Sequence, residues 1–157
     1  MLLKTIKFLL NFIFFLLLLS SITNGQEFYL CTRVIDGDTI VVDIDGKQEK
    51  VRLIGVDTPE TVHPEKPVEY FGKEASEFTK RMAEGKKVRL EYDWQDRDKY
   101  GRVLAYVYLE DGTFLNADIV RQGFGFAYTR YPFKYLEEFR QYEREARENG
   151  KGLWQER

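Results

Sequence analysis

The chain has 157 residues, with 24 lysines and arginines against 26 aspartates and glutamates, for a formal net charge of −2. This balance argues against nucleic-acid binding through a broadly basic surface, because phosphate neutralisation supplies much of that affinity. One histidine, His63, and one cysteine, Cys31, exclude a histidine-rich or thiolate zinc site and an internal disulfide. We expect Cys31 to be a buried small hydrophobe. Carboxylates, arginines and tyrosines remain for catalysis, and they suit a hard cation with oxygen ligands.

The first segment, residues 1–25, has the pattern of a secretory signal peptide. Two lysines precede an apolar run from Phe8 to Leu19, and small and polar residues follow it. The run is shorter than the about 20 apolar residues that span a membrane. We expect residues 1–25 to be removed and residues 26–157 to be secreted as one domain. The alternative is an uncleaved membrane anchor through residues 4–22.

The segment from Glu27 to Val56 predicts β-strands. Thr39–Ile44 is β-branched and apolar, which is typical of a strand. An Asp-Gly pair follows at residues 45–46 and predicts a tight hairpin turn, because both central positions of such a turn need a positive φ. The return strand, Glu49–Val56, leads directly into an acidic segment that begins at Asp57.

The rest of the chain alternates between helical and strand patterns. Apolar residues at helical spacing over Phe71–Met82 predict a first helix. We expect two further strands and two further helices, over Lys87–Trp94, Gly101–Leu109, Leu115–Gln122 with Asn116 as a candidate cap, and Tyr135–Glu148. Three strands, a helix, two strands and two closing helices are typical of a small barrel of the oligonucleotide-binding type.

Acidic residues gather at two points that the hairpin brings together. Asp38 lies just before the first hairpin strand, and Asp57 ends the strand paired with it. Asp36 and Asp38 are, taken singly, ordinary turn residues. Two adjacent carboxylates raise each other's pKa unless a cation lies between them. Calcium binds about six to eight oxygens, so Asp38, Asp57 and the Thr58 carbonyl could ligate it. Glu60 could hold a metal-bound water.

Two arginines are placed to reach the same site. Arg52 lies in the strand that leads to Asp57, and Arg102 opens a strand after a polar loop. A guanidinium is permanently charged and can grip a phosphate through two hydrogen bonds. Two arginines and a divalent cation can stabilise the charge that develops on a phosphodiester during hydrolysis. The pattern therefore predicts a phosphodiesterase.

Three motifs carry a family resemblance. They are IDGDT at residues 35–39, RLIGVDTPET at residues 52–61 and DKYGR at residues 98–102. In these motifs the chain resembles the staphylococcal nuclease family, and the similarity extends over residues 28–154. The resemblance implies an α+β fold, a five-stranded OB-fold barrel with three α-helices. It also implies one Ca²⁺ and cleavage of both DNA and RNA to 3′-phosphate ends.

The resemblance also implies a role for each matched residue. Asp38 and Asp57 would be calcium ligands, with Thr58 as a backbone ligand. Glu60 would orient or deprotonate the attacking water. Arg52 and Arg102 would clamp the phosphate and stabilise the transition state. Nucleotide contacts would come from Lys99, Tyr100 and Tyr128.

Two readings remain open at this point. The first is a secreted calcium-dependent nuclease, acting as a monomer on nucleic acid with no protein partner. The second is a catalytically inactive OB-fold module that binds nucleic acid or protein. A binding module has no need for three acids and two arginines at one site, which favours the nuclease.

The aromatic residues near the C-terminus also have two readings. Tyr128, Tyr131 and Tyr135 could stack on bases or could form the apolar seam of the last helix. Trp94 and Trp154 each end an element that must dock on the barrel, so we expect both to serve in packing.

Overall fold

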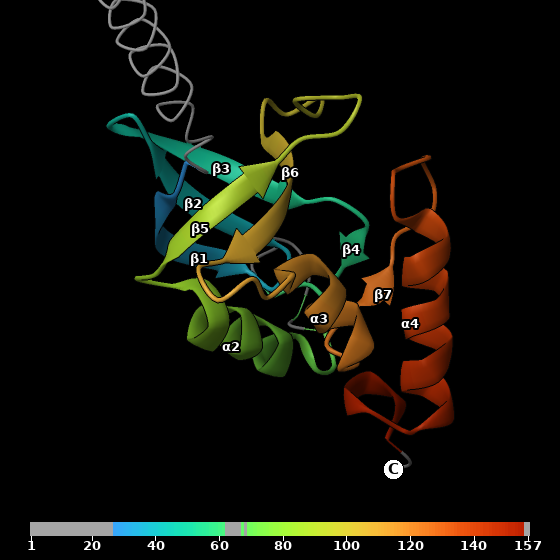
Figure 1. Ribbon diagram of the computed structural model, residues 1–157. Helices are drawn as coiled ribbons and strands as arrows, with labels where there is room; N and C mark the ends of the chain where they lie inside the picture. Colours follow the sequence, from blue (N-terminus) through green and yellow to red (C-terminus); the bar gives the residue numbers. More distant parts are fainter. Residues whose placement is uncertain (1–26, 62–66, 68, 156–157) are drawn as a thin grey trace, which may run out of the picture.

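The structure, a computed structural model, describes residues 27–61, 67 and 69–155 (Figure 1). The expected signal segment and His63 lie outside these residues. Within the described part of the chain, no helix is long and apolar enough to cross a membrane.

Five strands close into a barrel in the order β1-β2-β3-β6-β5. The strands are β1 (Tyr29–Asp36), β2 (Thr39–Ile44), β3 (Lys47–Leu53), β5 (Lys87–Glu91) and β6 (Val103–Leu109). Neighbours run antiparallel except β3 and β6, which are parallel. Closure leaves no open sheet edge in the barrel. The expected five-stranded α+β barrel with three helices is confirmed.

Three helices cover one end and one side of the barrel (Figure 1). They are α2 (Gly72–Ala83), α3 (Leu115–Arg121) and α4 (Leu136–Glu148), and a 3₁₀ turn, η1 (Gly152–Trp154), follows. Helices α2 and α3 lie together against the barrel, and α4 packs on α3. Each helix begins and ends within two residues of its predicted bounds.

A second, two-stranded sheet connects the barrel to the last helix. It pairs β4 (Val56–Asp57) with β7 (Phe126–Ala127) in antiparallel register. Sequence patterns did not predict β7, because a strand of two residues shows no periodicity. The pairing is important for position, since it fixes the segment that carries Asp57 against the approach to α4.

The hairpin between β2 and β3 has the turn that the sequence predicts. Asp45 and Gly46 have φ of 52° and 82°, so both central positions are left-handed. This turn matches the twist of the paired strands and sets their register. Thr39 consequently pairs with Arg52.

The barrel interior is filled by small and medium aliphatic side chains. The fully buried members include Ile40, Val42, Val51, Leu53, Val88 and Val107. Cys31 is fully buried among them, as expected. Burial raises the pKa of the Cys31 thiol to about 11, because the thiolate is unfavourable in apolar surroundings.

Asn116 is not a helix cap, which corrects the sequence-based expectation. Residue 116 lies inside α3 and is fully buried, and the residue before the helix, Phe114, makes no side-chain cap bond. The Asn116 carbonyl oxygen accepts a hydrogen bond from the Val107 amide at 2.8 Å. Its amide group donates to the carbonyls of Ile54 at 3.0 Å and Ala105 at 3.2 Å. Asn116 therefore ties α3 to β6 and to the chain that leaves β3.

Replacing Asn116 with alanine should destabilise the fold by about 2–4 kcal/mol, because three backbone groups each lose a hydrogen bond in a buried setting. Asn149→Ala is the matched control, since the exposed Asn149 side chain makes a single hydrogen bond, to the Glu145 carbonyl at the end of α4. The control should cost about 1 kcal/mol or less. Urea unfolding measures both changes, and equal losses would contradict the bridging role of Asn116.

Candidate active site

The hairpin register brings the first acidic residue to Arg52. Asp38 immediately precedes β2, and its carbonyl accepts a hydrogen bond from the Leu53 amide at 2.9 Å. Thr39 pairs with Arg52 across the two strands. The Asp38 side chain therefore lies beside the end of β3, where the chain turns toward Asp57.

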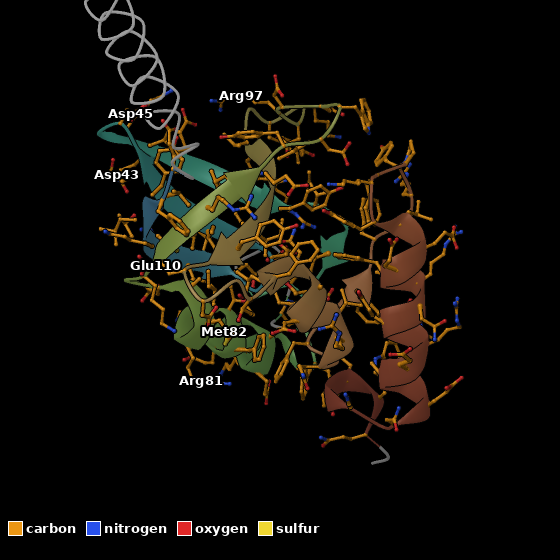
Figure 2. All side chains as sticks on the ribbon, in the orientation of Figure 1. Asp43, Asp45, Arg81, Met82, Arg97 and Glu110 are labelled. Carbon is orange, nitrogen blue, oxygen red and sulfur yellow. The ribbon has the colours of Figure 1, made fainter. Side chains whose placement is uncertain are left out.

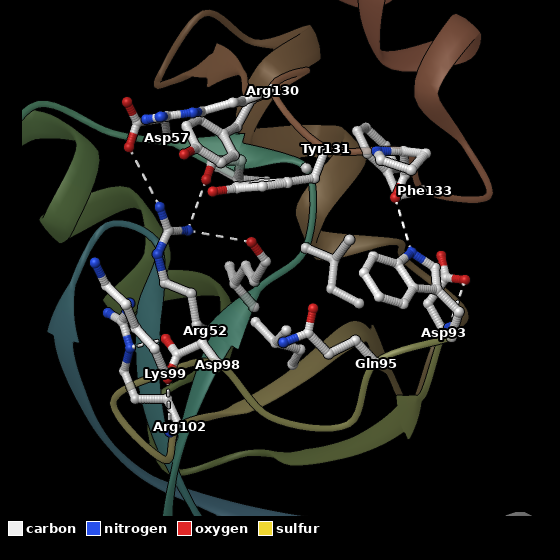
Figure 3. A pocket seen from close by; sticks show the side chains of 18 of the residues that line it. Arg52, Asp57, Asp93, Gln95, Asp98, Lys99, Arg102, Arg130, Tyr131 and Phe133 are labelled. Atoms are coloured by element: carbon white, nitrogen blue, oxygen red, sulfur yellow. Dashed lines mark hydrogen bonds and ion pairs between the residues drawn. The ribbon is translucent and has the colours of Figure 1, made fainter.

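Arg52 lies between two carboxylates. Its Nη2 atom is 3.1 Å from Asp38 Oδ2 and 3.2 Å from Asp57 Oδ1. Its Nη1 atom donates to the carbonyls of Leu53 at 3.1 Å and Val56 at 2.6 Å. Figure 3 shows this guanidinium with its bonds to Asp57 and to the backbone. One edge of Arg52 is thus fixed by the backbone, and the other faces the acids.

Thr58 is held between two glycines. A Cβ on Gly37 would lie 2.8 Å from the Thr58 hydroxyl oxygen. A Cβ on Gly125 would lie 2.9 Å from the Asp57 carbonyl oxygen and 3.1 Å from the Thr58 methyl carbon. The Thr58 amide donates to Asp38 Oδ2 at 3.0 Å. The absence of two side chains therefore lets residues 57–58 approach Asp38 closely.

Asp36 belongs to this site, although its sequence position suggested only a turn. Its carboxylate accepts hydrogen bonds from the Thr61 hydroxyl at 2.7 Å and from the Gly37 amide at 2.9 Å. Burial raises the pKa of Asp36 to about 6, and a hydrogen bond with Glu60 also raises it. The bonds from Thr61 and Gly37 oppose this rise. The signal in the sequence was the Asp-Gly-Asp spacing, which places a second acid beside Asp38.

The pKa of Asp57 is also raised. Partial desolvation is the main cause, the Arg52 guanidinium opposes it, and the Asp38 carboxylate adds to it. The carboxylates of Asp38 and Asp57 thus retain a mutual repulsion that one guanidinium does not remove. Additional positive charge at this position would be favourable.

Arg102 is oriented by the loop before β6. Its Nε atom donates to Asp98 Oδ2 at 2.7 Å. The other Asp98 oxygen accepts the backbone amides of Tyr100 at 2.9 Å and Arg102 at 3.0 Å. Arg97 anchors the loop to the barrel through a two-pronged ion pair with Glu49, at 2.9 and 3.1 Å.

Arg52, Asp57 and Arg102 form the shared wall of two cavities. The smaller cavity, about 350 Å³, contains most of the acids together with Lys50, which sequence patterns did not indicate. Its other lining residues are Ile35, Asp36, Asp38, Thr39, Thr58 and Glu60. The larger cavity, about 530 Å³, extends from the same wall toward the loop that precedes α4 (Figure 3). The predicted catalytic and ligand residues thus surround the smaller cavity.

The three predicted nucleotide-contacting residues line the larger cavity. Lys99 Nζ lies 4.9 Å from the centre of the Tyr100 ring, and Tyr100 is 71% exposed. Tyr128 is positioned by its amide, which donates to the Gly55 carbonyl at 2.9 Å. All three side chains are therefore accessible from solvent beside Arg102.

The other aromatic residues divide between packing and exposure. Tyr135 packs edge-on against Tyr106, at 4.8 Å between ring centres, so it belongs to the seam of the last helix. Trp154 packs edge-on against Phe126, as expected. The expectation of packing was wrong for Trp94, which is 65% exposed and lines the larger cavity.

The donor atoms of the smaller cavity fit a hard cation. Asp38 and Asp57 each place one carboxylate oxygen against the same Arg52 nitrogen. The two carboxylates therefore lie close together, and a positively charged group lies between them. The buried Thr58 hydroxyl oxygen has no hydrogen-bond partner among the described residues. No group of three or more acidic, histidine or cysteine side chains in the described residues could hold a metal. A cation here would need backbone carbonyls and water besides the two carboxylates, which is ordinary for calcium.

The closed barrel defines a class, the OB-fold proteins, and this one has two arginines beside a group of carboxylates, a set that is chemically suited to an anionic ligand. Comparison with known proteins gives the family. The family model described as Staphylococcal nuclease homologue matches residues 50–156.

Three relatives agree with this family. The chain is 51% identical over 131 residues to Thermonuclease from Staphylococcus hyicus, covering 83% of this chain and 77% of that protein. It is 50% identical over 137 residues to Thermonuclease from Staphylococcus intermedius, covering 87% and 81%. It is 43% identical over 125 residues to Endonuclease YncB from Bacillus subtilis (strain 168), covering 78% and 59%. The chain belongs to the staphylococcal nuclease family.

Adding a methyl group at Gly125 or Gly37 should lower nuclease activity roughly tenfold or more, because it displaces Thr58 and Asp57 from Asp38 and small misplacements of reacting groups are costly. Gly46→Ala is the control, since Gly46 has a φ of 82° and no atom within 4 Å of the added carbon. It lies next to Asp45 at the hairpin tip (Figure 2). The control should lose stability but keep activity. Rates and melting temperatures of all three variants distinguish displacement from general destabilisation.

Proposed function

We propose that residues 26–157 form a secreted, calcium-dependent nuclease that hydrolyses both DNA and RNA to 3′-phosphate ends. That the chain is a nuclease follows from its family and from relatives named thermonuclease and endonuclease. The observation that supports the other parts of the proposal is that Arg52, Asp57 and Arg102 line both cavities. An acidic cavity thus lies next to one that is lined by cationic and aromatic side chains. The protein acts as a monomer on nucleic acid, and residues 1–25 direct its export.

Calcium is the proposed cofactor, held by Asp38, Asp57 and the carbonyl of Thr58. These are hard oxygen donors, which calcium prefers. When bound, the ion would neutralise the two carboxylates and withdraw charge from a phosphate oxygen. Support comes from the raised pKa of Asp57, because desolvation and the Asp38 charge leave its ionised form short of positive partners.

The two arginines hold the phosphate from the shared wall. Nη1 of Arg52 is fixed by the carbonyls of Leu53 and Val56, so the guanidinium stays in place while Nη2 exchanges a carboxylate for a phosphate oxygen. Arg102 is oriented by Asp98 through its Nε atom, which leaves the terminal nitrogens directed away from that bond. Both groups stabilise charge that grows on the phosphate oxygens in the transition state.

Glu60 acts on the attacking water. It lines the smaller cavity beside Asp36, on the acidic side of the phosphate position. The water oxygen forms a bond to phosphorus while Glu60 orients the water or takes its proton. The bond from phosphorus to the 5′ oxygen breaks, and that oxygen leaves as a hydroxyl after gaining a proton. The product strand keeps a 3′ phosphate.

The nucleotide itself is held in the larger cavity. Lys99 supplies a positive charge, and Tyr100 and Tyr128 supply exposed rings next to Arg102. Aromatic rings bind bases of any sequence, because every base has a stacking face. This arrangement is suited to a substrate whose sequence is not read.

Calcium should be required for cleavage and should stabilise the free protein. Cleavage of denatured DNA and RNA should appear with millimolar calcium and vanish with chelator. Without nucleic acid, calcium at a hundredfold its dissociation constant should raise the unfolding free energy by about 2.7 kcal/mol. Asp38→Asn should lose both effects, and Asp45→Asn at the hairpin tip should keep both. Full activity in chelator would refute the calcium site, and absence of cleavage in both conditions would favour an inactive binding module.

Replacing Arg52 or Arg102 with lysine should reduce kcat roughly hundredfold, because a point charge does not reproduce the two-pronged grip on phosphate. Arg121→Lys is the control, since Arg121 pairs with Asp118 and lies over Tyr142, outside both cavities. Steady-state rates and melting temperatures are compared for the three variants. Turnover like that of the unmodified protein in either test variant would remove that arginine from the mechanism.

A further inference from the structure

The larger cavity has two chemically different ends. Arg52, Lys99 and Arg102 line the end at the proposed phosphate position. In Figure 3, Gln95 and Phe133 lie across the cavity from Lys99 and Arg102. Trp94 belongs to this second end, as the neighbour of Gln95 in the chain and as a lining residue of the same cavity. The cavity therefore extends well beyond the residues that would hold a phosphate.

Trp94 is fixed in place while its ring stays accessible. Its indole N–H donates to the Pro132 carbonyl at 2.9 Å, and its amide donates to Asp93 Oδ1 at 2.8 Å. Asp93 Oδ2 accepts the Lys134 amide at 2.9 Å and the Tyr106 hydroxyl. Trp94 is 65% exposed, so its ring remains accessible to solvent. A polar atom that is satisfied and a face that is open are what a stacking platform requires.

Besides Trp94, other exposed rings line the larger cavity. Tyr131 is 56% exposed and lines the cavity, and its ring centre is 6.2 Å from that of Tyr128. Tyr131 immediately precedes Pro132, whose carbonyl holds Trp94. The guanidinium of Arg130 lies 5.8 Å from the centre of the Tyr131 ring and adds positive charge beside it. The rings of Tyr128, Tyr131 and Trp94 thus all line the larger cavity.

We propose that Trp94, supported by Tyr131, forms a second base-binding subsite, which takes an unpaired base remote from the scissile phosphate. This inference rests on the proposed function. The occupant is single-stranded nucleic acid, because a base can stack on a protein ring only when it is free of its own helix. The chain carries a net negative charge, so long-range attraction for phosphate is weak and contact with bases gains importance. The subsite extends the length of strand that the enzyme grips.

The test uses single-stranded hexamers in which one base at a time is replaced by an abasic sugar. For the unmodified protein, loss of the base that occupies the subsite should weaken binding roughly tenfold, within the range measured for base stacking on aromatic side chains. Trp94→Ala should weaken binding of the intact hexamer by a similar factor and should no longer respond to the base missing at that position. Anisotropy of a labelled hexamer measures binding, and cleavage rates provide KM for hexamers and dinucleotides.

Two further variants distinguish stacking from a structural effect. Trp94→Phe keeps a ring but lacks the N–H that bonds to Pro132, so it should retain most of the binding and the positional response. Tyr92→Ala removes an exposed ring outside both cavities and should leave the abasic profile unchanged. A Phe variant as weak as the Ala variant would overturn the proposal, since the tether to Pro132 would then be responsible. Equal weakening by Trp94→Ala at every abasic position would also overturn it.

Failure of the proposed function gives a different result. If the unmodified protein cleaves no hexamer, anisotropy still reports whether one base position couples to Trp94. If cleavage is normal but hexamers and dinucleotides keep the same ratio of kcat/KM after Trp94→Ala, the nuclease assignment stands and the second subsite is rejected.

Discussion

The contact of Arg52 with Asp38 and Asp57 is the interaction on which the rest of the site depends. It needs three parts of the fold at once: the hairpin turn that sets the β2–β3 register, the closed barrel, and the β4–β7 pair that places Asp57. One guanidinium between two carboxylates leaves a net negative charge, and desolvation makes that charge costly. The site is therefore built in a state that favours a further cation.

The position of Arg52 also explains how an acidic chain can hold a polyanion. Attraction for phosphate does not come from the surface as a whole, because acidic residues outnumber basic ones. In the proposed function it comes from Arg52 and Arg102, which line both cavities, while Asp36, Asp38 and Glu60 line only the smaller one. A phosphate that approaches from the larger cavity would therefore meet these arginines without meeting Asp36, Asp38 or Glu60 directly.

Local patterns in the sequence predicted those parts of the fold and of the site whose structure depends on residues close together in the chain. The approach of Asp38 to Arg52 follows from the β2–β3 hairpin, and the hairpin follows from an Asp-Gly pair. Asn116 and Trp94 were misassigned because their partners are distant in the chain: Asn116 bonds to Ile54, and Trp94 bonds to Pro132. Neither a helical period nor the end of a strand contains information about such partners. Short segments such as β7 escape prediction because two residues show no periodicity.

Some of the long-range contacts that sequence patterns did not reveal help to shape the larger cavity. Asp93 and Trp94 tie the loop after β5 to the segment that precedes α4. The two segments are therefore held together where they line the larger cavity. Arg97 ties the same loop to β3 through its two-pronged ion pair with Glu49. A loop held at both ends presents its exposed rings at a fixed distance from Arg102. Rigid rings lose little entropy when a flexible single strand binds, and the entropic cost of binding then falls mainly on the nucleic acid.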